Sequence, residues 1–158
     1  MKLEEHPTVR RYRERMESGN NFPESKRLES GWLKALCREA GADDVGLVEV
    51  SRAAIEPYSG GLRELMPEAK SLVCMAFRLN REDLRTPAHS VANLEFRHAW
   101  EHANHSGRRI AGLLRDAGIR ALNAPAGFPM EMDRWPDQIW LTCDKIFAEQ
   151  AGLGRMGW

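Results

Sequence analysis

The sequence predicts an α/β domain in which helices cover a central sheet. Two short apolar runs rich in Val and Leu, DVGLVEV at residues 44–50 and SLVCMAFRL at 71–79, have the length and composition of strands. The segment 90–117 instead carries apolar residues at helical spacing and is closed by Gly118. Strands that alternate with helices in this way are typical of a layered α/β fold.

The chain before the first strand is predicted to be helical. Residues 7–17 form a short charged helix, and a loop rich in turn-forming residues follows it. A second helix is expected over residues 26–40, where Gly41 ends it and the apolar residues share one face; these are Leu28, Leu33, Leu36, Cys37 and Ala40. We therefore divide the chain into an N-terminal helical extension, 1–25, and an α/β domain, 26–158.

The remaining elements follow from local composition. A short helix is expected from Gly61 to the region of Pro67, and the strand at 71–79 is expected to be buried on both sides. IRALNA, residues 119–124, is predicted to return as a third strand. The three prolines of residues 125–136 exclude regular structure there.

The last segments are a short extended piece at 139–143 and a helix at 144–151, with Asp144 as its N-cap. GLGRMG, residues 152–157, then matches the dinucleotide-binding pattern G-x-G-x-x-G. That fingerprint must follow a strand and open a helix. Because the preceding residues, KIFAEQ, are polar and helical, the dinucleotide-binding interpretation is rejected.

The composition is typical of a globular protein and argues against a nucleic-acid-binding or membrane protein. Hydrophobic residues make up 42% and charged residues 29% of the 158 residues, as in ordinary globular proteins. Basic and acidic residues number 23 each, whereas proteins that grip nucleic acid usually have a basic excess. No apolar run approaches the length of a membrane span, and the N-terminus is too charged for a signal peptide. We therefore expect a cytoplasmic protein with no membrane partner.

The three cysteines, Cys37, Cys74 and Cys143, are dispersed and contain no C-x-x-C pair. This spacing argues against a disulfide framework and against a self-contained zinc or iron–sulfur site. Reduced cytosolic thiols are the plain interpretation. Cys143 lies close to the Gly-rich stretch, so it is either a redox or ligand residue or a small buried apolar thiol.

Three histidines share one face of the predicted long helix: His98, His102 and His105. Two imidazoles one turn apart can share a metal ion, but helical spacing alone does not supply the remaining ligands. We therefore predict no metal site. The charged residues around them suit either a solvated face or the lining of a cofactor cleft.

Four segments carry a further signal by their order along the chain: L-x-x-x-x-x-x-A-G-A-D-D-V-G at 33–46, LRELMPEAKSLV at 62–73, HANHSGRRIAGLLRDAGIRA at 102–121 and AEQAGLGRMG at 148–157. In this order they resemble the family that contains epoxyqueuosine reductases and corrinoid reductive dehalogenases. The last segment is similar to the family's A-E-x-A-G-L-G-x-x-G stretch. The resemblance covers nearly everything after residue 30.

The resemblance implies a nitroreductase-like α/β domain with a central mixed sheet that holds a cobalamin, followed by a ferredoxin-like domain with two iron–sulfur clusters. In the family, electrons pass from the clusters to cobalt, and the reduced cobalt reacts with the substrate. The Gly-rich stretch lies near the corrin, where missing side chains let the backbone approach a flat ligand. The resemblance therefore makes Gly152, Gly154 and Gly157 cofactor-binding candidates, and we add His98 and His102 as residues that line the cleft.

The family pattern is not complete in this sequence. Its cysteine runs would lie downstream of residue 158, so we expect a truncated front part that needs a ferredoxin-like domain or another electron donor. Epoxyqueuosine reductases carry a proton-donating acid within D-[ST]-A-P. Here that region reads PDQIWLTCDK, which leaves Asp137 as the candidate catalytic residue. The balanced charge disfavours a tRNA substrate.

The sequence thus predicts the cofactor-holding domain of a cobalamin- and iron–sulfur-dependent oxidoreductase that acts on a small-molecule substrate. Turnover by this polypeptide alone is not expected, because the reductant lies elsewhere. The alternatives are a non-catalytic corrinoid- or flavin-binding module and a structural remnant that binds nothing.

Overall fold

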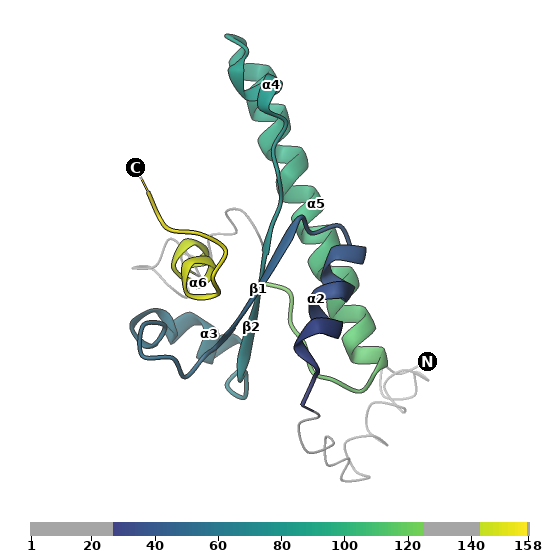
Figure 1. Cartoon of the computed structure of the whole chain (residues 1–158), viewed down its shortest axis with the longest axis vertical. Helices are drawn as coiled ribbons and strands as arrows, with labels where there is room; N and C mark the ends of the chain where they lie inside the picture. Colours follow the sequence, from purple (N-terminus) through teal and green to yellow (C-terminus); the bar gives the residue numbers. More distant parts are fainter. Residues whose placement is uncertain (1–26, 125–142, 158) are drawn as a thin grey trace, which may run out of the picture.

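The computed structural model describes residues 27–124 and 143–157 (Figure 1). The described residues form a mixed α/β structure that is mostly helical, with a two-stranded antiparallel sheet. In order, its elements are α2 (Ser30–Glu39), β1 (Asp44–Glu49), the 3-10 helix η2 (Glu56–Tyr58), α3 (Gly60–Leu65), β2 (Ser71–Ala76), α4 (Arg81–Arg85), α5 (His89–Asp116) and α6 (Asp144–Gln150). The expected α/β class is confirmed at this level. The helix expected at 7–17 and the loop at 125–136 lie outside the described residues, as does nearly all of the extended piece at 139–143.

The sheet has a helical layer on each face. β1 pairs with β2 so that Asp44 lies opposite Ala76 and Glu49 lies opposite Ser71. Successive residues of a strand point to opposite faces of the sheet, so the two faces of β1 can enter different cores. Figure 1 shows α2 and α5 on one side of the strands, with α3 and α6 on the other.

The first core lies between the sheet and the pair α2 and α5. Its buried residues are Leu33, Cys37, Ala42, Val45, Ile110 and Leu114. Residues of β2, including Val73 and Met75, pack against it. Because each fully buried Leu, Ile or Val side chain stabilises the fold by about 1.5–3 kcal/mol, this cluster accounts for the docking of both helices.

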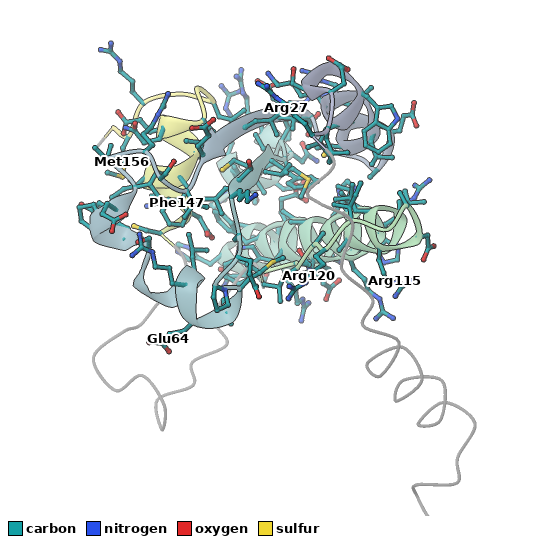
Figure 2. All side chains as sticks on the ribbon, turned by 90° about the horizontal axis from the view of Figure 1, so that it is seen from below. Arg27, Glu64, Arg115, Arg120, Phe147 and Met156 are labelled. Atoms are coloured by element: carbon teal, nitrogen blue, oxygen red, sulfur yellow. The ribbon has the colours of Figure 1, made fainter. Side chains whose placement is uncertain are left out.

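The second core lies on the opposite face, between the sheet and the helices α3 and α6. It consists of Val48, Ile55, Leu62 and Phe147. Ile55 is fully buried and Phe147 is 4% exposed. Figure 2 shows Phe147 on the inner side of α6. An isolated pair of strands is marginal in water, so coverage of both faces is what makes this small sheet stable.

Three helices end in the same way, with an Ala-Gly pair. Gly41 after α2, Gly118 after α5 and Gly152 after α6 have φ values of 113°, 78° and 83°. In each case the glycine N–H donates to the carbonyl three residues before it, and the next N–H donates to the carbonyl five residues before it, at 2.9–3.1 Å. This is the Schellman motif, in which glycine accepts the left-handed conformation without a Cβ penalty. It explains why these helices stop where the sequence predicts.

The strand predicted at 119–124 is wrong. Within the described residues this segment joins no sheet, and it lies against α5 instead. Its Ile119 and Ala121 side chains pack against the first core, and Arg120 pairs with Glu68 at 3.2 Å. The alternating apolar pattern is therefore satisfied by packing on a core surface, without a strand partner.

Two further expectations need correction near strand and helix ends. The residue before α6, Cys143, is its N-cap and makes no side-chain cap bond, whereas Asp144 is the first helical residue, where its charge suits the helix dipole. β2 is partly exposed rather than buried on both sides, and it ends at Ala76. There the carboxylate of Asp43 accepts the backbone N–H of Arg78 at 2.7 Å, in place of a strand partner.

We predict that Gly46→Ala loosens the attachment of α6 to β1. A Cβ at Gly46 would lie 2.5 Å from the carbonyl oxygen of Ala151 and 2.7 Å from the Ala151 Cβ, so backbone must move. Overpacking of this kind costs about 1–3 kcal/mol of unfolding free energy. Urea unfolding measures the loss, with Gly60→Ala as the control because a Cβ at Gly60 meets no described atom within 4 Å. Equal midpoints for Gly46→Ala and wild type would contradict the close approach.

Candidate functional site

The Gly-rich stretch 152–157 is held in place by the docking of α6. The end of α6 lies against β1 at Gly46, where Ala151 makes its close approach. The Arg52 guanidinium donates to the carbonyl oxygen of Gln150 at 2.5 Å, which satisfies one of the free carbonyls at the helix end. The start of the stretch is therefore fixed relative to the sheet.

The three candidate glycines of this stretch differ in what the fold requires of them. Gly152 is needed to end α6, as its Schellman hydrogen bonds and φ of 83° show. Gly154 ends no helix but has a φ of 159°, which side chains rarely adopt, whereas Gly157 has no positive φ. A Cβ at either would meet no described heavy atom within 4 Å. Met156 is 56% exposed and lies at the edge of the molecule in Figure 2. Within the described part of the chain, no side chain therefore covers the backbone at Gly154 and Gly157.

The candidate histidines lie on α5. The His102 ring packs edge-on against Phe77, with ring centroids 5.1 Å apart. It also covers Gly41, where a Cβ would come within 2.6 Å of the His102 Nε2. His98, His102 and His105 are all exposed, so these contacts cover only part of the His102 ring. His102 therefore has a packing role at the junction of α2, β2 and α5.

The structure does not bring the histidines and the glycines together. α5 packs on the face of the sheet that carries the first core, while α6 and the Gly-rich stretch belong to the second core on the opposite face (Figure 1). The described residues therefore give no support to one pocket shared by 98–105 and 152–157. Among residues 27–124 and 143–157, no group of three or more His, Cys, Asp or Glu side chains is placed to hold a metal ion.

Sequence reasoning missed an ion pair beside His102. The Asp43 carboxylate accepts hydrogen bonds from the backbone N–H and from Nε of Arg78, both at 2.7 Å. The backbone hydrogen bond, followed by the side-chain bond and the nearby charges of Arg78 and His102, lowers the pKa of Asp43. This carboxylate stays ionised at neutral pH and ties the end of β2 to the turn before β1.

The cysteines are structural residues in this arrangement. Cys37 is buried in the first core, whereas Cys74 and Cys143 pack against the second core on the other face. Burial, together with the negative charge of Asp144, raises the pKa of Cys74 to about 11, and burial also raises the pKa of Cys37. Metal and cluster ligation requires thiolates, so the raised pKa values of Cys37 and Cys74 disfavour ligation by these two thiols. The three cysteines also lie on opposite faces of the sheet and form no common cluster site in the described residues.

A second feature that the sequence did not reveal is a polar cleft on α5. It is an open surface cleft of about 500 Å³, lined by Asn104, Arg108, Ala111, Gly112, Arg115 and Asn123. The signal was present in the sequence as arginines seven residues apart, but the contribution of Asn123 depends on the path of the chain after α5. Asp137, the candidate catalytic acid, lies outside the described residues.

Comparisons with known proteins add no assignment to this geometry. No protein-family model, no curated protein and no solved structure matches the chain. Within the described part of the chain, no helix has the length and apolar character needed to cross a membrane. Function is therefore argued from the residues themselves.

We predict that the glycines of the Gly-rich stretch separate into two classes when stability is measured without ligand. Gly152→Ala should lower the free energy of unfolding by about 1–2 kcal/mol, because alanine is disfavoured in the left-handed conformation. Gly157→Ala should change it little, since Gly157 is not among the glycines with positive φ and its Cβ would enter open space. Chemical denaturation of both variants measures the difference. Equal losses would show that the division between capping and open glycines is wrong.

Proposed function

We propose that this chain is the cofactor-holding domain of a cobalamin- and iron–sulfur-dependent oxidoreductase, with a nitroreductase-like α/β architecture. The observation that carries the proposal is the order of the four family-like segments. Each includes a defined junction of the fold: the turn from α2 to β1, the turn from α3 to β2, the end of α5 and the end of α6.

The described residues suit one wall of a corrinoid site. Gly154 and Gly157 expose backbone next to the end of α6, and no described side chain stands over them. A large flat ligand can approach such backbone closely. The histidines of α5 lie on the other face, so in this proposal the wall is made by the 152–157 backbone and His98 and His102 take no part in it.

In this proposal the cobalamin, the chain and a separate electron donor have different roles. A bound cobalamin would supply the metal centre that reacts with a small-molecule substrate. The chain would position that group through the 152–157 backbone, held by the Arg52–Gln150 hydrogen bond and the Gly46–Ala151 contact. Three cysteines cannot provide the four thiolates of an iron–sulfur cluster, so electrons must come from a ferredoxin-like domain or another donor. Asp137 is the proposed proton donor.

A non-catalytic corrinoid- or flavin-binding module is the second candidate. The properties and positions of the cysteines favour this candidate. Cys37 and Cys74 have raised pKa values, and the three cysteines lie on opposite faces of the sheet. A chain with no reductant of its own can bind such a cofactor without turning over substrate.

We predict that the purified chain binds cobalamin through the Gly-rich stretch, as read by a change in the cobalamin visible spectrum during titration. Gly157→Val should weaken binding by about tenfold, or 1.4 kcal/mol, because the added side chain blocks close approach. Gly60→Val is the matched control, since its side chain also enters open space but lies on α3. Binding should be weak, because the 152–157 backbone forms only one wall of the site and offers a small contact area.

The same titration with flavin mononucleotide separates the candidates. Uptake of flavin without uptake of cobalamin would replace the corrinoid proposal with the flavin-binding module. Binding of neither cofactor would overturn both. Equal weakening by Gly157→Val and Gly60→Val would place the cofactor elsewhere.

A further inference from the structure

A polar cleft lies on the outer side of the C-terminal half of α5. Five of its six lining residues come from that helix, and Asn123 comes from the segment that runs back beside it. Ile110 and Leu114, on the inner side of the same helical turns, are buried in the first core. Figure 2 shows Arg115 at the end of α5, away from the sheet. The cleft is thus separate from the Gly-rich stretch on the opposite face of the sheet.

The charge of the cleft is positive. Arg108 and Arg115 are seven residues apart on α5, so they lie about 10 Å apart along the helix and on the same side of it. Arg115 pairs with its neighbour Asp116 at 3.1 Å, and both side chains are mostly exposed. Arg108 makes no ion pair with any residue of the described part of the chain. None of the described residues that line the cleft is acidic.

At one corner of the cleft, Asn123 packs closely against Gly107. The Asn123 side chain sits against Gly107, where a Cβ would lie 2.0 Å from the Asn123 Oδ1. The Asn123 Nδ2 also donates to the carbonyl oxygen of Asn104 at 3.4 Å. At the floor, Ala111 and Gly112 are small, and a Cβ at Gly112 would meet no described atom within 4 Å. The absence of bulk at 107 and 112 therefore shapes the cleft.

We propose that this cleft binds the phosphate group of a phosphorylated small molecule. Guanidinium groups match the oxygens of phosphate in paired hydrogen bonds, and two of them balance its charge of about −2. A single carboxylate carries a charge of −1 and would balance only one of the two guanidinium groups. The volume of about 500 Å³ is larger than a phosphate ion needs and lies within the range of small-molecule sites.

The competing contact within the protein is weak. The Arg115–Asp116 pair is solvent-exposed, and exposed ion pairs of this kind contribute little to stability. A phosphate group can therefore engage Arg115 without breaking a buried interaction. Asn123 also lines the cleft, and its side-chain amide can donate to a remaining phosphate oxygen.

Isothermal titration of the full chain with ribose 5-phosphate, inorganic phosphate and ribose tests this proposal. We expect ribose 5-phosphate to bind more tightly than inorganic phosphate and ribose not to bind. Arg108→Gln should weaken binding by about tenfold or more, since a charge-assisted hydrogen bond is lost. Arg109→Gln is the matched control, because it removes the same charge from the next residue of α5, which does not line the cleft.

A second variant tests the built corner without removing charge. Gly107→Ala should displace Asn123 and weaken ribose 5-phosphate binding, while α5 stays folded because alanine favours helix over glycine. Circular dichroism checks the helix.

No binding of either phosphate compound up to ~10 mM would overturn the proposal, as would equal losses in Arg108→Gln and Arg109→Gln. Equal affinity for phosphate and ribose 5-phosphate would exclude the small molecule and leave a site for the free ion. The proposal does not rest on cobalamin binding, and its failure leaves that function untouched.

Discussion

β1 supplies side chains to both hydrophobic cores, and the arrangement of every other element depends on this. Val45 enters the core with α2 and α5, while Val48 enters the core with α3 and α6. Alternation along a strand makes this double role unavoidable once both faces are covered. Because a pair of strands has little stability of its own, the helices on the two faces and the sheet stabilise one another. Gly46, between these two valines, is the point where α6 comes closest to the strand.

The same constraint decides which functional residues can act together. Helices cover both faces of the sheet, so the residues that follow α6 lie on one face and the side chains of α5 lie on the other. The Gly-rich stretch and the histidines therefore belong to different surfaces, and the arginine-lined cleft belongs with α5. Gly152 illustrates a related point, because an A-G-L sequence that resembles a cofactor motif also serves to end a helix. Gly154 has a backbone reason for glycine in its φ of 159°, so Gly157 is the described glycine of the stretch for which the backbone conformation gives none.

Local chemistry made much of the fold predictable. The period of apolar residues located α5, and the Ala-Gly pairs marked the ends of three helices because glycine alone accepts the required backbone conformation easily. The failures came from tertiary contacts. Residues 119–124 have the composition of a strand, yet their apolar side chains are satisfied against the first core and Asn123 against Gly107. The Asp43–Arg78 contact joins residues 35 positions apart, and no local pattern announces it. Helical spacing placed His98 and His102 on one face of α5 but could not say which face of the sheet α5 would cover.

The measurement that tests the account most directly is amide hydrogen exchange of the full chain with and without excess cobalamin. It reports, residue by residue, which backbone the ligand covers. We predict slower exchange at residues 152–157, with residues 98–105 of α5 unchanged, because the two segments lie on opposite faces of the sheet. Protection of 98–105 without protection of 152–157, or no protection at either segment, would contradict it.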